Sequence, residues 1–209
     1  FFNNGEAHLH FTPHSFGLIA RSLHWLTALL ILTAIPLGLY ANALPFDTAE
    51  AAAHKAQIFS LHKSLGVAAF FTALVRILYA LTQARPAPMH PDRKLENFAA
   101  EAVHWMLYIS LLAVPLSGWV HHAATTGFAP ILWPFGQNLP FVAKSEPVAQ
   151  AASLLHWVFT KLLVASLLLH IAGALKHAFI DRDDTLNRML RGTSGGQPHA
   201  KSALPLITA

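Results

Sequence analysis

Four long apolar stretches dominate this sequence, at about residues 18–41, 59–81, 99–121 and 151–179. A helix needs roughly 20 apolar residues to cross the hydrocarbon core of a membrane, and all four stretches meet that length. Because lipid offers no hydrogen bonds, a spanning segment must pair its own backbone amides, which favours helices. Only 11% of the residues are charged, against about 25% in soluble domains. The sequence therefore predicts an all-α integral membrane protein, a four-helix bundle.

The remaining segments are polar or mixed in character. Residues 1–17 form a polar N-terminal segment, and they lack the apolar core of a signal peptide. Residues 18–191 contain the predicted membrane domain, and residues 192–209 begin as a small polar linker. The chain ends in an apolar run, residues 203–209, which we interpret as the start of a further apolar segment.

Composition excludes several classes of function. The chain has no cysteine, which excludes disulfides, iron–sulfur clusters, thiol catalysis and covalently attached c-type haem. The net charge of +4 is modest and concentrated in a few segments. It therefore indicates membrane topology, and we expect no nucleic-acid partner.

The lysines and arginines between the stretches predict the orientation. The first and third connections carry one each, Lys55 and Lys144. The second connection and the segment after the fourth stretch are richer, with Arg85, Arg93, Lys94, Arg182, Arg188, Arg191 and Lys201. Positive residues stay on the cytoplasmic side, so we expect both termini and the second connection to be cytoplasmic. The first and third connections then face the periplasm.

Histidines in the apolar stretches are the main functional signal. His156 and His170 are fourteen residues apart on the fourth stretch, about four helical turns and ~21 Å, so they share one helix face. His24 lies near the start of the first stretch and His62 near the start of the second. With the predicted topology, His24 and His170 share the cytoplasmic level, while His62 and His156 share the periplasmic level.

Two histidine pairs at two depths are what two bis-histidine haems require. Two neutral imidazoles facing each other across an iron leave no position for O2, and such a site transfers single electrons. A single histidine in a membrane helix is often only a packing or hydrogen-bonding residue. Four at matched depths favour two non-covalent b haems, with His24/His170 and His62/His156 as axial ligand pairs.

Other residues share this geometry. Arg76 lies fourteen residues after His62, and an intramembrane arginine needs a partner, which we expect to be a haem propionate. The alternative is snorkelling to the interface. Gly38 lies fourteen residues after His24 and would let the first helix approach the periplasmic haem, or serve helix packing alone. Lys63 and Arg21 neighbour predicted ligands and could meet propionates or lipid headgroups.

His104, near the start of the third stretch, has no matching partner for a third haem. It could hydrogen-bond a quinone or a lipid headgroup; otherwise it is an interfacial residue. After the fourth stretch, Asp183 or Asp184 could cap a short amphipathic helix over residues 185–190. Arg188 and Arg191 on that helix would face anionic headgroups.

The sequence resembles the bacterial cytochrome b561 family over about residues 18–191. The first and second stretches match it at Arg21-Ser22-Leu23-His24-Trp25 and Leu61-His62-Lys63-Ser64-Leu65-Gly66, and the third stretch at His104, Tyr108, Pro115 and Gly118. The strongest match is on the fourth, where Leu155-His156 and His170 lead into the run from Leu175 to Met189, which contains Asp184-Thr185-Leu186-Asn187-Arg188-Met189.

The resemblance implies a four-helix protein of the bacterial inner membrane with two b haems. The family's axial ligands carry over onto His24, His62, His156 and His170. Members exchange electrons with quinone, and one type passes electrons from superoxide to ubiquinone. We therefore expect electron transfer between a periplasmic donor such as superoxide and a quinone or protein partner. Whether this makes the chain an oxidoreductase or an electron-transfer protein stays open.

Two alternatives remain at this point. The chain could be the electron-transfer b-type subunit of a larger respiratory or dehydrogenase complex, with other subunits as partners. It could also be a structural or lipid-handling subunit whose histidines bind no redox centre.

Overall fold

The computed structural model describes residues 16–83, 88–125 and 127–192, and within them every regular element is a helix. The helices are α2 (Leu18–Ala43), α3 (Ala49–Leu81), α4 (Lys94–Ala124), α5 (Glu146–Lys176), the π-helical turn η1 (His177–Asp181) and the short α6 (Thr185–Leu190). The predicted all-α class is therefore confirmed. The predictions for residues 1–15 and 193–209 lie outside the described residues.

Four of these helices are long and apolar enough to cross a membrane: α2, α3, α4, and α5 together with η1. Large apolar side chains cover their outer faces, as at Leu29, Leu39 and Leu168, each about two-thirds exposed. A soluble protein rarely presents so continuous an apolar surface, whereas lipid accommodates it. The outer faces therefore agree with four membrane-spanning helices.

The second helix begins ten residues before its predicted start. Half of residues 49–58 are alanine, the best helix former, and polar residues lie between the alanines. Thr48 caps this helix, because its side-chain oxygen accepts a hydrogen bond from the Ala51 amide at 3.1 Å. The hydropathy pattern identifies the part that can lie in lipid, and the helix itself extends beyond that part.

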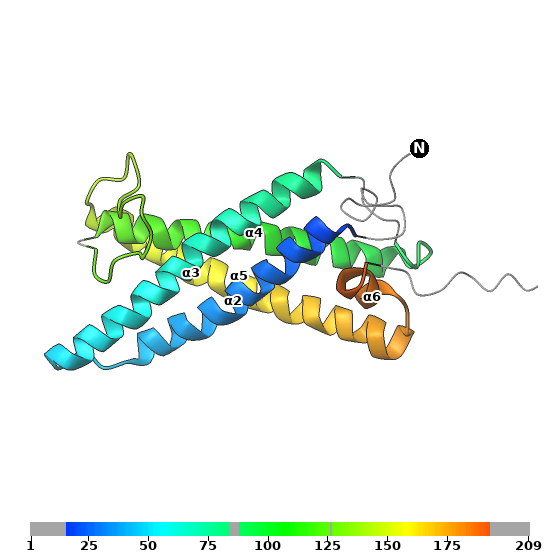
Figure 1. Cartoon of the computed structure of the whole chain (residues 1–209), viewed down its shortest axis with the longest axis horizontal. Helices are drawn as coiled ribbons and strands as arrows, with labels where there is room; N and C mark the ends of the chain where they lie inside the picture. The colour runs from blue at the N-terminus through cyan, green and yellow to red at the C-terminus, as the bar shows by residue number, and fades with distance from the viewer. Residues whose placement is uncertain (1–15, 84–87, 126, 193–209) are drawn as a thin grey trace, which may run out of the picture.

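The helices pack as two hairpins. α2 packs along α3, α4 packs along α5, and α3 joins the hairpins by packing on α4. Figure 1 shows the α2–α3 hairpin crossing the α4–α5 hairpin obliquely. Small side chains such as Ala69 and Ala73 allow close approach, and the central apolar cluster contains Ile31, Ala69, Ala73, Leu107, Leu111 and Leu163.

The connection between α4 and α5 folds back onto α3 and α4. The Trp133 ring stacks on Phe71, with ring centres 6.0 Å apart, and meets Trp119 edge-on at 4.8 Å. The Ser64 hydroxyl accepts a hydrogen bond from the Leu132 amide at 2.8 Å. The aromatic residues of this connection therefore attach it to α3 and α4.

At the opposite end of the bundle, α6 returns to the start of α2 (Figure 1). Arg182 has a φ of 53°, and this left-handed residue turns the chain from η1 towards α6. The Thr185 amide donates to the Asp183 carboxylate at 2.9 Å. Of the two predicted caps, Asp183 is therefore the one that accepts a helix amide, although the N-cap position of α6 is Asp184, whose side chain makes no capping bond. The last carbonyls of α6 accept hydrogen bonds from Arg21 and Trp25, both at 3.2 Å.

Candidate functional site

The structure brings His62 and His156 together from α3 and α5, with ring centres 6.3 Å apart and ring planes at 89°. Each ring is held by a backbone carbonyl of the neighbouring helix. His62 Nδ1 lies 2.9 Å from the Ala34 oxygen, and His156 Nδ1 lies 2.8 Å from the Val114 oxygen. Because a carbonyl only accepts, both Nδ1 atoms carry the proton and both Nε2 atoms keep a lone pair.

A glycine lies beside each of these two rings. A Cβ atom on Gly38 would lie 2.7 Å from His62 Cε1, and one on Gly118 would lie 3.0 Å from His156 Nδ1. Any side chain at Gly38 would therefore force the His62 ring to move. Gly38 was predicted to allow a close approach of the first helix, and the group that α2 approaches is the His62 ring itself.

His24 and His170 also lie together, from α2 and α5, with ring centres 6.1 Å apart and ring planes at 62°. Here a side chain holds one ring, since Arg76 donates to His24 Nδ1 at 3.0 Å. The same guanidinium lies over the Tyr108 ring, 5.6 Å from its centre. A guanidinium only donates, so His24 accepts at Nδ1 and carries its proton at Nε2 in this arrangement.

A third histidine belongs to this level. The His104 ring meets His170 edge-on, with ring centres 5.1 Å apart, and its Nδ1 lies 2.6 Å from the Ala100 oxygen. Our interpretation of the sequence left His104 with a quinone, a lipid headgroup or an interfacial role, and it missed the contact with His170. The signal that sequence reasoning missed is a constant spacing of 80 residues between α2 and α4, which makes His104 the counterpart of His24.

Lys63 and Arg21 have protein partners in the structure. The Lys63 ammonium donates to the carbonyls of Phe128 and Ala129 and lies 3.2 Å from His122 Nδ1. These contacts engage its three N–H groups, so Lys63 anchors the α4–α5 connection, where the sequence left a propionate or a lipid headgroup as its partner. Arg21 likewise donates to the Leu190 carbonyl at the end of α6.

The separation between ring centres in each pair can be compared with that of two imidazoles bound to one metal ion. Two imidazoles that bind one metal ion from opposite sides, each through a bond of about 2 Å, have ring centres roughly 6 Å apart. The 6.3 Å and 6.1 Å separations both match this value. His62 and His156 also have the required tautomer, with the Nε2 lone pairs ready to bind. His24 could bind through Nε2 once its proton moves to Nδ1, which requires the Arg76 guanidinium to turn away.

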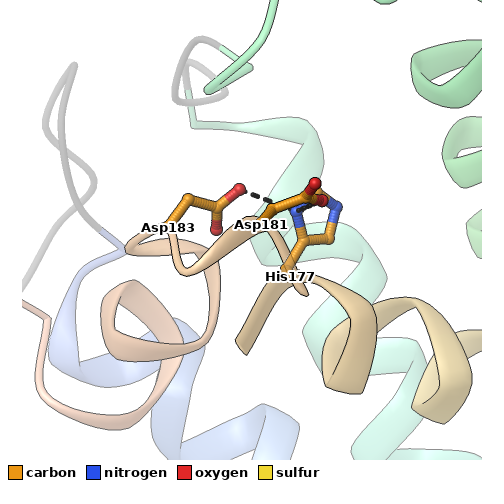
Figure 2. A group of neighbouring side chains, drawn as sticks. All are labelled: His177, Asp181 and Asp183. Carbon is orange, nitrogen blue, oxygen red and sulfur yellow. Dashed lines mark hydrogen bonds and ion pairs between the residues drawn. The ribbon is translucent and has the colours of Figure 1, made fainter. Parts of the chain in front are cut away.

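A separate group of charged side chains lies at the end of α5. Figure 2 shows His177, Asp181 and Asp183 facing one another across the turn of η1. The Asp183 carboxylate accepts from His177 Nδ1 at 2.7 Å and from His90 Nε2 at 3.1 Å. Burial opposes ionisation of Asp183, but the hydrogen bonds from Thr185 and His177 outweigh it and lower its pKa to about 2.

Asp181 is paired with two cations, Arg93 at 2.9 Å and Lys176 at 2.7 Å. These cations would compete with any metal ion for the carboxylate, although three residues here have ligand atoms close enough to hold one. We therefore interpret the group as an ion-pair cluster. It ties the α3–α4 connection, through His90 and Arg93, to the end of α5.

Comparison with known proteins agrees with this architecture. Residues 15–192 match a family model described as prokaryotic cytochrome b561. The chain is 34% identical over 185 residues to cytochrome b561 homolog 2 of Escherichia coli, covering 88% of this chain and 95% of that protein. It is 28% identical over 131 residues to cytochrome b561 homolog 1 of Escherichia coli, covering 62% of this chain and 72% of that protein. It is 23% identical over 176 residues to the probable superoxide oxidase CybB of Yersinia pestis, covering 84% and 95%.

The family match covers all four membrane-length helices and extends through α6. Family members bind b-type haem, which agrees with the absence of cysteine for covalent attachment. Together with the apolar outer faces, the match identifies a bacterial membrane protein. The chain therefore belongs to the prokaryotic cytochrome b561 family of membrane electron-transfer proteins.

Proposed function

We propose that this chain is a two-haem cytochrome that carries electrons across the bacterial inner membrane, with one b haem at each histidine pair. The observation that carries the proposal is the presence of two cross-helix pairs, His62/His156 and His24/His170, with ring centres 6.3 and 6.1 Å apart. His156 and His170 lie about four turns apart on α5. The pairs therefore occupy different depths, as electron transfer across a bilayer requires.

A bound haem supplies a one-electron iron couple, and the protein supplies position and environment. At the His62–His156 pair, the Ala34 and Val114 carbonyls accept from Nδ1 of each ring, so Nε2 of each neutral ring would be the nitrogen that binds iron. Two such ligands leave no open position on the metal, which favours electron transfer over binding of O2. Glycines 38 and 118 provide the space that these two rings occupy.

At the His24–His170 pair, Arg76 has a second role in the proposal. Its guanidinium now donates to His24 Nδ1 at 3.0 Å, and ligation through Nε2 requires it to leave that nitrogen. Arg76 lies within a membrane-spanning helix, where an unpaired charge is costly. We infer that it then pairs with an anionic group at the haem edge, the propionate contact predicted from its spacing.

The distribution of lysine and arginine supports an orientation. The α3–α4 connection and the segment after α5 carry most of the positive charge outside the four membrane-length helices, including Arg93, Arg182 and Arg188. By the positive-inside rule, this end of the bundle faces the cytoplasm. His24 and His170 are then the cytoplasmic pair, and His62 and His156 are the periplasmic pair.

We propose superoxide as the periplasmic donor and a membrane quinone as the acceptor. The support for superoxide is the similarity to a relative from Yersinia pestis that bears the name probable superoxide oxidase. The support for a quinone is the apolar outer face of the helices, which gives a lipid-soluble carrier direct access from the bilayer. The same electron path would work in reverse if the two potentials favour it.

The first experiment is a pyridine haemochrome assay on the detergent-purified chain. We expect two b haems per chain and a low-spin spectrum. One haem per chain would contradict the two-haem proposal. No haem would favour the alternative that the chain is a structural subunit without a redox centre.

The donor is tested next with the same preparation. A superoxide-generating system should reduce the haems, and a soluble quinone should then reoxidise them. Added superoxide dismutase is the control and should abolish the reduction. Haems that stay oxidised under superoxide, while dithionite reduces them, would exclude superoxide as the donor.

A further inference from the structure

The two hairpins repeat one pattern of residues. Eighty positions separate α2 residues from their counterparts on α4, in the pairs His24/His104, Trp25/Trp105, Ala34/Val114 and Gly38/Gly118. Ninety-four positions separate α3 residues from their counterparts on α5, in the pairs Leu61/Leu155, His62/His156, Arg76/His170 and Ile77/Ile171. The offset is constant within each helix pair, and the matched residues include histidine, tryptophan and glycine. This pattern indicates that the sequence contains one helical hairpin twice.

The contacts repeat with the residues. In the first hairpin, His62 bonds to the Ala34 carbonyl at 2.9 Å and lies against Gly38. In the second hairpin, His156 makes the counterpart bond to the Val114 carbonyl at 2.8 Å and lies against Gly118. His62 and His156 are therefore each other's counterparts, and this pair is built symmetrically from the two hairpins.

The other level breaks this symmetry. His24 has His104 as its counterpart, and His170 has Arg76. The proposed ligands His24 and His170 are thus not counterparts of each other. Each instead contacts a side chain from its own hairpin, because Arg76 lies 3.0 Å from His24 and the His104 ring lies 5.1 Å from that of His170. The two contacts are therefore counterparts of each other, since His104 matches His24 and His170 matches Arg76.

We propose that His104 is a positioning residue for His170, as the counterpart of the contact between Arg76 and His24. This rests on the proposed function, in which His170 is an axial ligand. A histidine that binds iron through Nε2 is oriented by a partner for its Nδ1 proton. His62 and His156 use backbone carbonyls for this purpose, whereas within the described part of the chain His170 has no carbonyl bonded to its ring.

The tautomer of His104 suits this role. Its Nδ1 lies 2.6 Å from the Ala100 oxygen, one turn earlier on α4, and must therefore carry the proton. Nε2 is then the accepting nitrogen, on a ring that the helix backbone holds in place. The edge-on contact at 78° brings this ring against His170, so a small rotation of either ring would join an N–H of His170 to the His104 acceptor.

The test compares His104→Leu and His104→Gln with the wild-type chain. Leucine removes the accepting nitrogen, and the amide oxygen of glutamine restores an acceptor at about the reach of histidine Nε2. His54→Leu is the matched control, because His54 is an exposed histidine of α3 beside Tyr40, remote from this level. The readouts are haem content, redox titration and the low-spin electron paramagnetic resonance signals, which respond to the angle between axial imidazole planes.

We expect all variants to keep two haems. In His104→Leu, the potential and resonance signal of one haem should shift, namely the haem that His24→Ala removes, and His104→Gln should partly restore both. Unchanged signals in a two-haem protein would overturn this inference and leave the proposed function standing. Loss of that haem from both His104 variants would show that haem binding itself requires His104, and it would also overturn the positioning role. A wild-type chain without a haem at His24 and His170 would overturn both proposals.

Discussion

The two histidine pairs are alike in ring separation and different in what holds the rings. His62 and His156 bond to backbone carbonyls and lie against glycines, so main-chain atoms determine their orientation. His24 and His170 instead contact the side chains of Arg76 and His104. A backbone carbonyl carries no net charge and is present whatever the residue. An arginine or histidine contact adds charge or polarity that a substitution can change.

The two pairs should therefore differ in how strongly a substitution changes the surroundings of their rings. The His62–His156 pair is built from equivalent parts of two repeated hairpins, and its environment should resist substitution except at the glycines. The His24–His170 pair breaks the repeat, and its environment should respond strongly to single substitutions. The following predictions test that comparison, in order of decreasing effect.

Removing one ligand should have the largest effect. His62→Ala or His156→Ala should reduce the haem content from two to about one per chain and spare the haem at the other pair. His24→Ala or His170→Ala should do the converse, because the proposed function assigns each haem its own pair of rings. Haemochrome assays of the four variants measure this. A variant that keeps two bis-histidine haems would show that its residue is not a ligand.

Gly38→Ala should damage the His62–His156 pair alone. The new Cβ would lie 2.7 Å from His62 Cε1, so the ring must move and its bond to Ala34 must lengthen. Overpacking of this kind costs about 1–3 kcal/mol. We expect weakened binding or an altered spectrum of that haem, measured by haem titration of the purified variant.

Gly66→Ala is the matched control for this change. Gly66 also lies within a helix, α3, and a Cβ there would meet nothing within 4 Å. Replacing a helical glycine by alanine without a clash should stabilise the helix by roughly 0.5–1 kcal/mol. Equal spectral effects of the two substitutions would contradict the role of Gly38 as space for His62.

Arg76→Leu should lower the potential of the haem at His24 and His170. A nearby positive charge favours the reduced iron, so its loss favours the oxidised form by roughly tens of millivolts at the effective dielectric of a protein. The haem at His62 and His156 should change much less. Redox titration checks this, with Arg76→Lys as the variant that keeps the charge. Equal shifts in the two redox potentials would show that Arg76 does not act specifically on the haem at His24 and His170.

The smallest effect concerns the ion-pair cluster at the end of α5. Hydrogen bonds from Thr185 and His177 lower the Asp183 pKa from an ordinary value of 3.8 to about 2, despite the opposing effect of burial. The ionised carboxylate therefore stabilises the fold above about pH 4, and this contribution is lost as the pH falls towards 2. We expect the hydrogen-exchange protection factors of residues 177–192, which are corrected for the intrinsic pH dependence of exchange, to fall over that interval.

Asp183→Asn should reduce this pH dependence, and the part that remains should come from Asp181, which is ion-paired with Arg93 and Lys176 in the same cluster. Asp184→Asn is the matched control, because Asp184 accepts a hydrogen bond from Asn187, at 3.2 Å, whereas Asp183 accepts one from His177. A pH dependence as large in Asp183→Asn as in the wild-type chain would show that Asp183 does not contribute to it.

Much of the fold could be predicted because its causes are local. The length of each apolar stretch predicts a spanning helix, and the starts and ends of the described helices differ mainly where polar, alanine-rich residues extend α3. The short α6 and its cap by Asp183 follow from a few neighbouring residues. The grouping of histidines by depth follows from the rise of a helix and from alternating direction across the membrane.

The sequence by itself determined the number of membrane-length helices, the lack of cysteine for covalent haem attachment and the grouping of four histidines into two pairs. These depend on hydropathy, residue type and helical period, which are properties of single segments. Only the tertiary structure decided which ring nitrogen carries a proton, that Lys63 anchors the α4–α5 connection, and that His104 lies against His170. Those features depend on the angle at which helices cross and on the path of a connection. Each is a contact between segments that lie far apart in the chain, so the pattern within one segment does not predict it.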